Sequence, residues 1–157
     1  MIFIKILIDG DSCCQKDNII RIAKKKHIPV DIYCDVKHNI EDDYAITHIV
    51  DCAPDSTDIA LANSVEPNDI VITNDTGLAA LILAKKGYAI NNYGLTFTKQ
   101  NIQQLLSKRH IIKQTRRKTH RNKLHNDLDQ TTTRHSFCDT LHYTIRKAKR
   151  NEKRKEM

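Results

Sequence analysis

The stretch Ile2–Cys14 constrains the fold more than any other part of the sequence, because a run of apolar residues ends abruptly in Asp-Gly-Asp. The run is rich in Ile and is broken by a single Lys, which is typical of a strand buried on both faces of a parallel sheet. Gly10 lets the chain turn and leaves Asp9 and Asp11 at the carboxyl end of this strand, where open α/β sheets bind ligands. Because two such carboxylates repel each other unless a cation or a proton offsets them, the stretch predicts a functional site.

Strands and helices alternate after this stretch. Strands are predicted over 28–34, 47–50, 70–73 and 88–90, an exposed loop over 35–45, and helices over 16–26, 55–65, 78–86, 98–109 and 136–150. This alternation is typical of a parallel sheet with right-handed crossovers, and it predicts an α/β sandwich.

Charge is distributed unevenly along the chain. Residues 1–107 contain 10 Lys and Arg against 14 Asp and Glu, whereas residues 108–157 contain 16 against 5. We therefore predict an α/β domain over 1–112 and a basic segment over 113–157, whose last helix docks on the domain through an apolar stripe. Such asymmetry favours a polyanionic partner, and the alternative is a solvated tail without a partner. The residues expected to contact nucleic acid are Arg116, Arg117, Lys118, Arg121 and Lys123.

The five cysteines are odd in number and include no Cys-x-x-Cys pair, which indicates reduced thiols in a cytoplasmic protein. No four-ligand spacing for zinc is present. The apolar run at the N-terminus is too short for a signal sequence or a membrane span. We therefore expect no membrane partner, and the oligomeric state stays open.

A third carboxylate, Asp75, follows the strand predicted over 70–73. If this strand neighbours the first one where the strand order reverses, Asp9, Asp11 and Asp75 converge in one crevice. Carboxylates are the ligands that hard cations such as Mg²⁺ and Mn²⁺ take, together with water and substrate phosphate. One or two such ions can activate water for displacement at phosphorus.

Structural roles are the alternatives for most of these acids. Asp75 could cap the helix that follows it, and Asp58 could form a reciprocal capping pair with Asp55. Asp11 could be a turn residue. Asp9 is the hardest to explain structurally, because it ends a buried strand without starting a helix.

Three motifs carry a resemblance to a known family. Asp9–Cys14 is similar to an Asp-Ala-Asp-Ala-Cys-Pro segment after a strand, Asp58 matches an Asp at the start of a central helix, and Ile72–Ala79 matches Ile/Val-Thr-x-Asp-x-x-Leu-Ala. Over about residues 2–110 the chain resembles the YaiI/YqxD family of uncharacterised bacterial proteins, which is grouped with PIN-like nuclease domains. The resemblance implies a three-layer α/β/α PIN-like sandwich with a mainly parallel sheet of about five strands, followed here by a basic C-terminal extension with a helix.

The resemblance also implies a metal-dependent nuclease that hydrolyses phosphodiester bonds, with RNA as the expected partner. Its catalytic residues, which would also hold Mg²⁺ or Mn²⁺, would be Asp9, Asp11, Asp58 and Asp75. Cys14 departs from the family pattern, in which Pro is found. Asn91–Gly94 stands where the family usually has Asn-Pro-Arg-Gly, so a phosphate-binding Arg is missing.

Two other function classes fit parts of the sequence. The first is a nucleic-acid-binding protein without catalysis, whose affinity comes from the basic segment. The second is a haloacid-dehalogenase-like phosphatase, in which Asp9 would attack phosphorus and Asp11 would act as general acid. That superfamily has Thr or Val where Cys13 stands, which disfavours the phosphatase.

Overall fold

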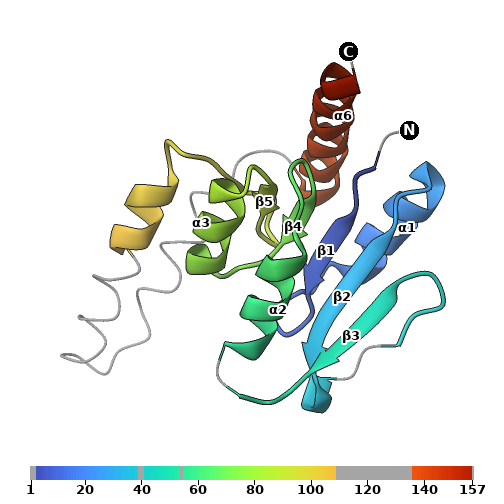
Figure 1. The fold of residues 1–157 in the computed structure, drawn as a ribbon, viewed down its shortest axis with the longest axis vertical. Coiled ribbons are helices and arrows are strands. Elements are labelled where there is room, and N and C mark those ends of the chain that lie inside the picture. The colour runs from blue at the N-terminus through green and yellow to red at the C-terminus, as the bar shows by residue number, and fades with distance from the viewer. Residues whose placement is uncertain (1–2, 39–40, 54, 109–135, 157) are drawn as a thin grey trace.

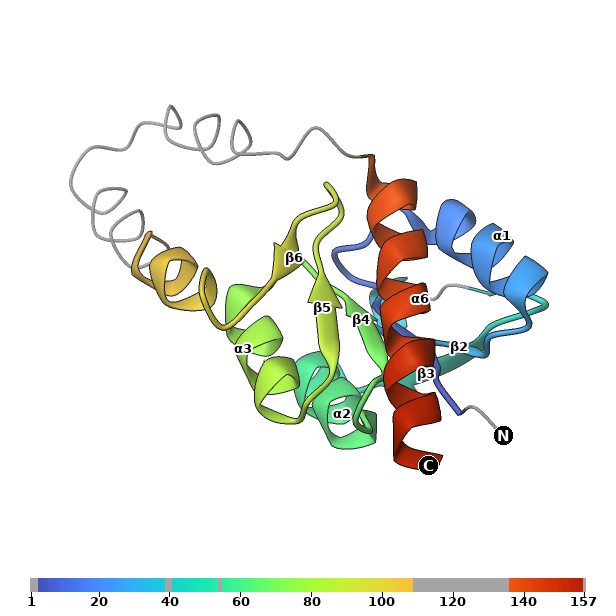
Figure 2. The ribbon, with the colours of Figure 1, turned by 90° about the horizontal axis from the view of Figure 1, so that it is seen from above.

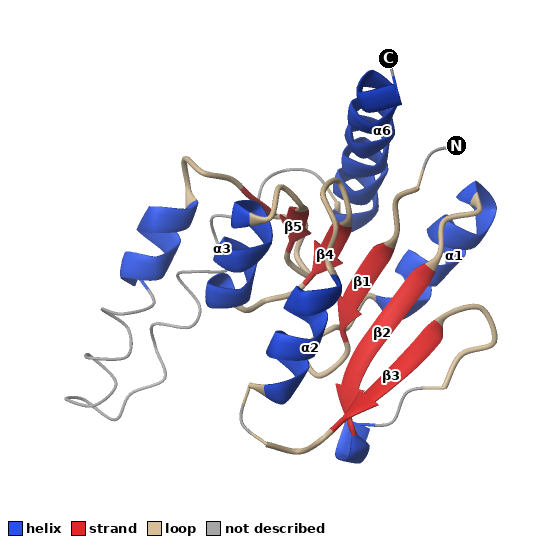
Figure 3. Cartoon of the chain, viewed as in Figure 1, coloured by secondary structure: helices blue, strands red, loops and turns tan. Residues whose placement is uncertain are grey.

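A computed structural model describes residues 3–38, 41–53, 55–108 and 136–156 (Figure 1). The strands in these ranges are β1 (Ile6–Asp9), β2 (Val30–Asp35), β3 (Ile46–Val50), β4 (Ile70–Ile72), β5 (Tyr88–Ile90) and β6 (Thr96–Phe97). The helices are α1 (Lys16–Lys26), α2 (Ser56–Ser64), α3 (Thr76–Ala84), α6 (Phe137–Glu156), the 3₁₀ turn η1 (Val36–His38) and a helix over 102–108. Figure 3 shows how the helices flank the strands.

The strands form one sheet in the order β3-β2-β1-β4-β5-β6. All neighbouring strands are parallel except β5 and β6, which are antiparallel. β1 lies between β2 and β4, so that Ile6 is paired with Val30 on one side and Ile70 on the other. The expected adjacency of the first and fourth strands is therefore confirmed, and the strand order reverses next to Asp9.

Helices cover both faces of the sheet, which confirms the three-layer α/β/α prediction (Figure 2). Alternate residues of the central strands enter two separate cores, because successive strand side chains point to opposite faces. Ile6 and Ile72 pack with α1 and α6, whereas Leu7 and Val71 pack with α2 and α3. All four side chains are fully buried.

The last helix belongs to the first of these cores. Phe137, Leu141, Ile145 and Ala148 are buried in it and form one stripe of α6. Four apolar positions spaced by three or four residues are the pattern of a helix that packs through one face. No described helix is both long and apolar enough to cross a membrane.

Differences from the predicted elements have local causes. β1 begins at Ile6 rather than at Ile2, and Phe3 is 72% exposed. Pairing with β2 starts only at Val30, because Pro29 has no N–H and contributes just its carbonyl, which accepts from the Ile6 amide. The two-residue strand β6 is too short to produce a period in the sequence, so the expected five strands become six.

Candidate functional site

Asp9 is the last residue of β1 and is buried on the face covered by α2 and α3. Its Oδ2 accepts hydrogen bonds from Thr73 Oγ1 at 2.9 Å and from Ser12 Oγ at 3.1 Å. No described residue donates to its Oδ1. Burial raises the pKa of Asp9, the two hydroxyls lower it, and the nearby charges of Asp11 and Asp75 raise it further. Asp9 is thus a buried acid with one oxygen held and one oxygen open to a ligand.

Asp11 connects the turn after β1 to two other elements. Its Oδ2 accepts from Thr57 Oγ1 at 3.0 Å, and its Oδ1 accepts from the Asp35 amide at 3.3 Å. The turn lies close against β2, because a Cβ at Gly10 would stand only 2.9 Å from the Tyr33 carbonyl oxygen. Asp11 therefore has more than the local turn role considered from the sequence, since it also joins the turn to α2 and β2.

Asp75 caps α3, as the structural alternative proposed. Its Oδ1 accepts from the Leu78 amide at 3.1 Å, and its own amide donates to Thr73 Oγ1 at 3.0 Å. It also forms a hydrogen bond with Asp58, which lies in the first turn of α2. Asp75 therefore both caps α3 and belongs to the acidic cluster.

Asp58 is the acid whose titration is most perturbed by this arrangement. Burial raises its pKa to about 6, and the charges of Asp75, Asp9 and Asp55 and the hydrogen bond with Asp75 contribute to the rise. Asp55 makes no side-chain cap bond, so the reciprocal capping pair considered for Asp58 is wrong.

The structure thus brings Asp9, Asp11, Asp58 and Asp75 together at the carboxyl edge of the sheet. They are contributed by β1, the following turn, α2 and the start of α3. The residues expected to contact nucleic acid, Arg116, Arg117, Lys118, Arg121 and Lys123, lie outside the described residues.

A hollow of about 240 Å³ opens beside this cluster, where Asp11 and Asp58 form part of its wall. Asp35, Asp51 and Asp55 line it as well. Asp35 and Asp51 were missed by the sequence reasoning, although Asp35 ends β2 and Asp51 follows β3. Asp9 was selected because it stands at the end of a predicted strand. The same criterion, applied to the second and third strands, would have selected Asp35 and Asp51.

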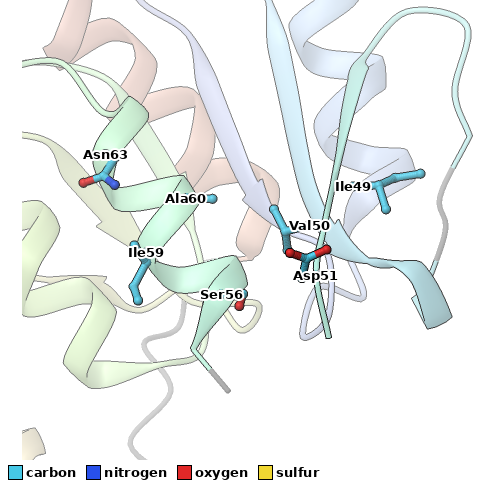
Figure 4. A pocket seen from close by; sticks show the side chains of 7 residues that line it. All are labelled: Ile49, Val50, Asp51, Ser56, Ile59, Ala60 and Asn63. Carbon is cyan, nitrogen blue, oxygen red and sulfur yellow. The ribbon is translucent and has the colours of Figure 1, made fainter. Parts of the chain in front are cut away.

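A second hollow, of about 460 Å³, lies between β3 and α2 (Figure 4). The end of β3 forms one wall and α2 the other, with Ile49, Val50 and Ile59 among the lining residues. Among the described residues that line it, Asp51 is the only acid, and Asp51 also lines the first hollow. Because none of the four clustered acids lines the second hollow, we do not include it in the candidate site.

The donor set suits a hard divalent cation, since all four groups offer carboxylate oxygens. No described residue donates to Oδ1 of Asp9, and the pKa of Asp58 is raised. Both features suit a site whose negative charge would be neutralised by a bound cation. In the described ranges, however, no three His, Cys, Asp or Glu side chains are already grouped as ligands. Ligation by Asp58 would require its carboxyl to be ionised, which its raised pKa disfavours in the absence of a cation.

The sequence matches known proteins over most of this architecture. Residues 7–147 match the family described as "Uncharacterized BCR, YaiI/YqxD family". A UPF0178 protein of Alkaliphilus oremlandii is 48% identical over 114 residues, which are 73% of this chain and 74% of the relative. UPF0178 proteins of Lachnoclostridium phytofermentans and Clostridium tetani are 45% and 40% identical over 113 residues, which are 72% of this chain and 76% and 77% of the relatives. No solved structure matches the chain. The chain therefore belongs to the YaiI/YqxD family.

Proposed function

We propose that the protein is a divalent-metal-dependent phosphodiesterase that cleaves RNA. The observation that carries the proposal is the gathering of Asp9, Asp11, Asp58 and Asp75 at the point where the strand order reverses. Open α/β sheets bind ligands at this point. Burial and the neighbouring carboxylates raise the pKa values of Asp9 and Asp58, and perturbed pKa values of this kind cluster at functional sites.

Each acid has a distinct part in this proposal. Asp9 would present its open Oδ1, and Thr73 and Ser12 fix its orientation through Oδ2. The orientation of the Asp11 carboxylate is fixed by the hydrogen bonds that it accepts from Thr57 Oγ1 and the Asp35 amide. Mg²⁺ or Mn²⁺ bound by these acids would supply an activated water and neutralise charge at phosphorus.

Asp58 would supply or accept a proton. With a pKa of about 6, Asp58 exchanges its proton near neutral pH, where a general acid or base is most effective. Asp75 stays aligned because α3 holds its Oδ1 through the Leu78 amide. A cation bound beside Asp58 would favour its ionised form, so metal binding would release the proton of Asp58.

The test is cleavage of labelled RNA by the full-length protein with millimolar Mn²⁺ or Mg²⁺. We expect cleavage by the wild type and its loss in Asp9→Asn, which keeps the shape of the side chain and removes its charge. Asp43→Asn is the matched control, because Asp43 is exposed and far along the chain from the cluster. Equal cleavage by the Asp9→Asn variant, or no cleavage by the wild type with either metal, would refute the proposal.

A non-catalytic nucleic-acid-binding protein is the second candidate. It is favoured by the bonds that already engage Asp11 and Asp75 within the fold, and by the lack of a preformed ligand group in the described residues. In this case Arg116, Arg117, Lys118, Arg121 and Lys123 would supply the affinity. RNA binding without cleavage, weakened when the cations over 113–123 are neutralised, would support this candidate over the first.

A further inference from the structure

α1 and α6 lie side by side on the face of the sheet opposite to the acidic cluster (Figure 2). Both helices are strongly basic along their solvent side. α1 carries five Lys and Arg against one Asp, and α6 carries seven against three acids. Whereas the four acids gather at the carboxyl edge, these cations accumulate toward the ends of both helices.

The ends of both helices lie at the amino edge of the sheet. α6 begins beside the carboxyl end of β5, where Thr140 Oγ1 donates to the Gly94 carbonyl at 3.0 Å. It ends beside the start of β4, where Asn68 Nδ2 donates to Glu152 at 2.6 Å. α1 likewise starts after β1 and ends before β2. The basic surface is thus separated from the acids both by the sheet and along the strands.

The outer side of α6 combines cations with an aromatic ring. Tyr143, Arg146 and Arg150 follow one another at spacings of three and four residues, which places them on one side of the helix. All three are exposed, and the Tyr143 side chain is 62% exposed. Leu141 and Ile145 of the same helix are buried and face the core, whereas Tyr143 lies on the solvent side.

The two helices lie close enough for charges of α1 to act on a residue of α6. His142 of α6 has a lowered pKa, which is due to desolvation and to the charges of Lys26 and Arg146, while Asp139 opposes the shift and Arg21 adds to it. Arg21 and Lys26 belong to α1 and Arg146 belongs to α6, so cations of both helices lie near His142 where the two helices are in contact. Lys24 and Lys25 of α1 add to the basic surface and are exposed.

We propose that this α1/α6 surface binds single-stranded RNA, with Tyr143 stacking on a base and the cations around it contacting phosphates. The proposal rests on the proposed function, in which RNA is the substrate. Cations neutralise phosphates by releasing counterions, and an aromatic ring among them stacks on any base. The acids at the carboxyl edge repel the same strand, so the α1/α6 surface supplies the affinity that the site of cleavage lacks.

The first arm of the test removes charge. Full-length protein carrying Lys24→Gln, Lys25→Gln, Arg146→Gln and Arg150→Gln is compared with wild type for binding to single-stranded RNA without metal. We expect the slope of log affinity against log salt to fall by about 0.7 for each cation that contacts a phosphate. The matched control removes four exposed cations elsewhere, through Gln at Lys37, Lys86, Lys99 and Lys108. An unchanged slope in the first variant, or an equal fall in the control, overturns the proposal.

The second arm removes the ring. Tyr143→Ala should lower the affinity for single-stranded RNA by about 5- to 150-fold, the range measured for one stacked base, whereas Tyr143→Phe should bind as the wild type does. Equal binding by all three proteins refutes the stacking. Binding of the wild type to vesicles rich in phosphatidylserine, but not to RNA, would also overturn the proposal and make the surface a membrane contact.

Both arms use metal-free binding and include the Asp9→Asn variant, which should bind RNA at least as well as the wild type. If the charge and ring variants behave as expected while no protein cleaves RNA, the surface stands and the proposed catalysis fails. If the wild type cleaves RNA while both variants bind normally, the α1/α6 proposal fails and the catalytic one stands.

Discussion

Asp58→Asn should stabilise the protein near neutral pH, because it removes a charge that the fold disfavours. The pKa of Asp58 is about 6 in the folded state, against an ordinary value of 3.8. Between pH 3.8 and about 6 the carboxyl is protonated in the folded state and ionised in the unfolded state, so folding takes up a proton. The free energy of unfolding therefore decreases as the pH rises over this range. Below about pH 4 the carboxyl is neutral in both states and the penalty disappears.

The size of the effect follows from the shift. Two pKa units correspond to about 3 kcal/mol, and screening by water at this partly exposed group reduces the figure to about 1–2 kcal/mol. At about pH 7.5 we expect Asp58→Asn to raise the free energy of unfolding by that amount. For a chain of this length the melting temperature should rise by about 2–8 °C. The Asn amide can still donate a hydrogen bond to Asp75, as the protonated acid does.

Urea unfolding at a series of pH values from about 4 to about 8 measures this difference. The gain should be absent at the acid end and reach its full size above pH 6, whereas Asp43→Asn, on the exposed surface, should show no such dependence. A gain of the same size at pH 4 and at pH 7.5 would show that it does not come from the charge of Asp58. A carboxyl titration by NMR with a midpoint near 4 would refute the reasoning directly.

Three other predictions concern the metal, the core and the first turn. Mn²⁺ at a hundredfold excess over its dissociation constant should stabilise the wild type by about 2.7 kcal/mol, and Asp9→Asn should lose most of this response; a melting curve indifferent to millimolar divalent ions would contradict the site. Ile6→Ala and Ile72→Ala should each cost about 2–5 kcal/mol in urea unfolding, and a loss below about 0.5 kcal/mol would contradict their burial between packed layers. Gly10→Ala should cost about 1–3 kcal/mol, because its Cβ would stand 2.9 Å from the Tyr33 carbonyl oxygen; wild-type stability would show that the turn moves freely.

Sequence periodicity was sufficient to predict the helices and strands whose bounds depend mainly on their own residues. The helix predicted over 16–26 has those bounds in the structure, because buried Ile19, Ile22 and Ala23 recur at helical spacing against exposed lysines. The strand predicted over 88–90 is found as β5. The helix expected over 98–109 is described over 102–108, after Thr98 and Asn101 bond each other's amides as a capping pair.

The candidate site was predictable only in part, because the properties of its acids depend on tertiary neighbours. Asp9 could be singled out by its place at the end of an apolar strand. The raised pKa of Asp58 could not be predicted, since it depends on burial and on the charges of Asp75 and Asp9, which other elements contribute. Asn92 was likewise unremarkable in the sequence, although it is buried and donates through Nδ2 to the Ser12 carbonyl at 2.5 Å.

The place of α6 in the fold has a consequence for synthesis of the chain. Its stripe completes a core whose other members, among them Ile6, Ile72 and Ile90, are made much earlier. About 60 residues separate the end of β5 from Ala148, and a ribosome adding about 5–20 residues per second needs about 3–12 s to make them. During this interval α1 alone covers this face of the nascent sheet, and the part that α6 covers in the complete fold is open. A chaperone that recognises apolar strands would find its target there during synthesis, and a transcript truncated before Phe137 would leave that part of the face open permanently.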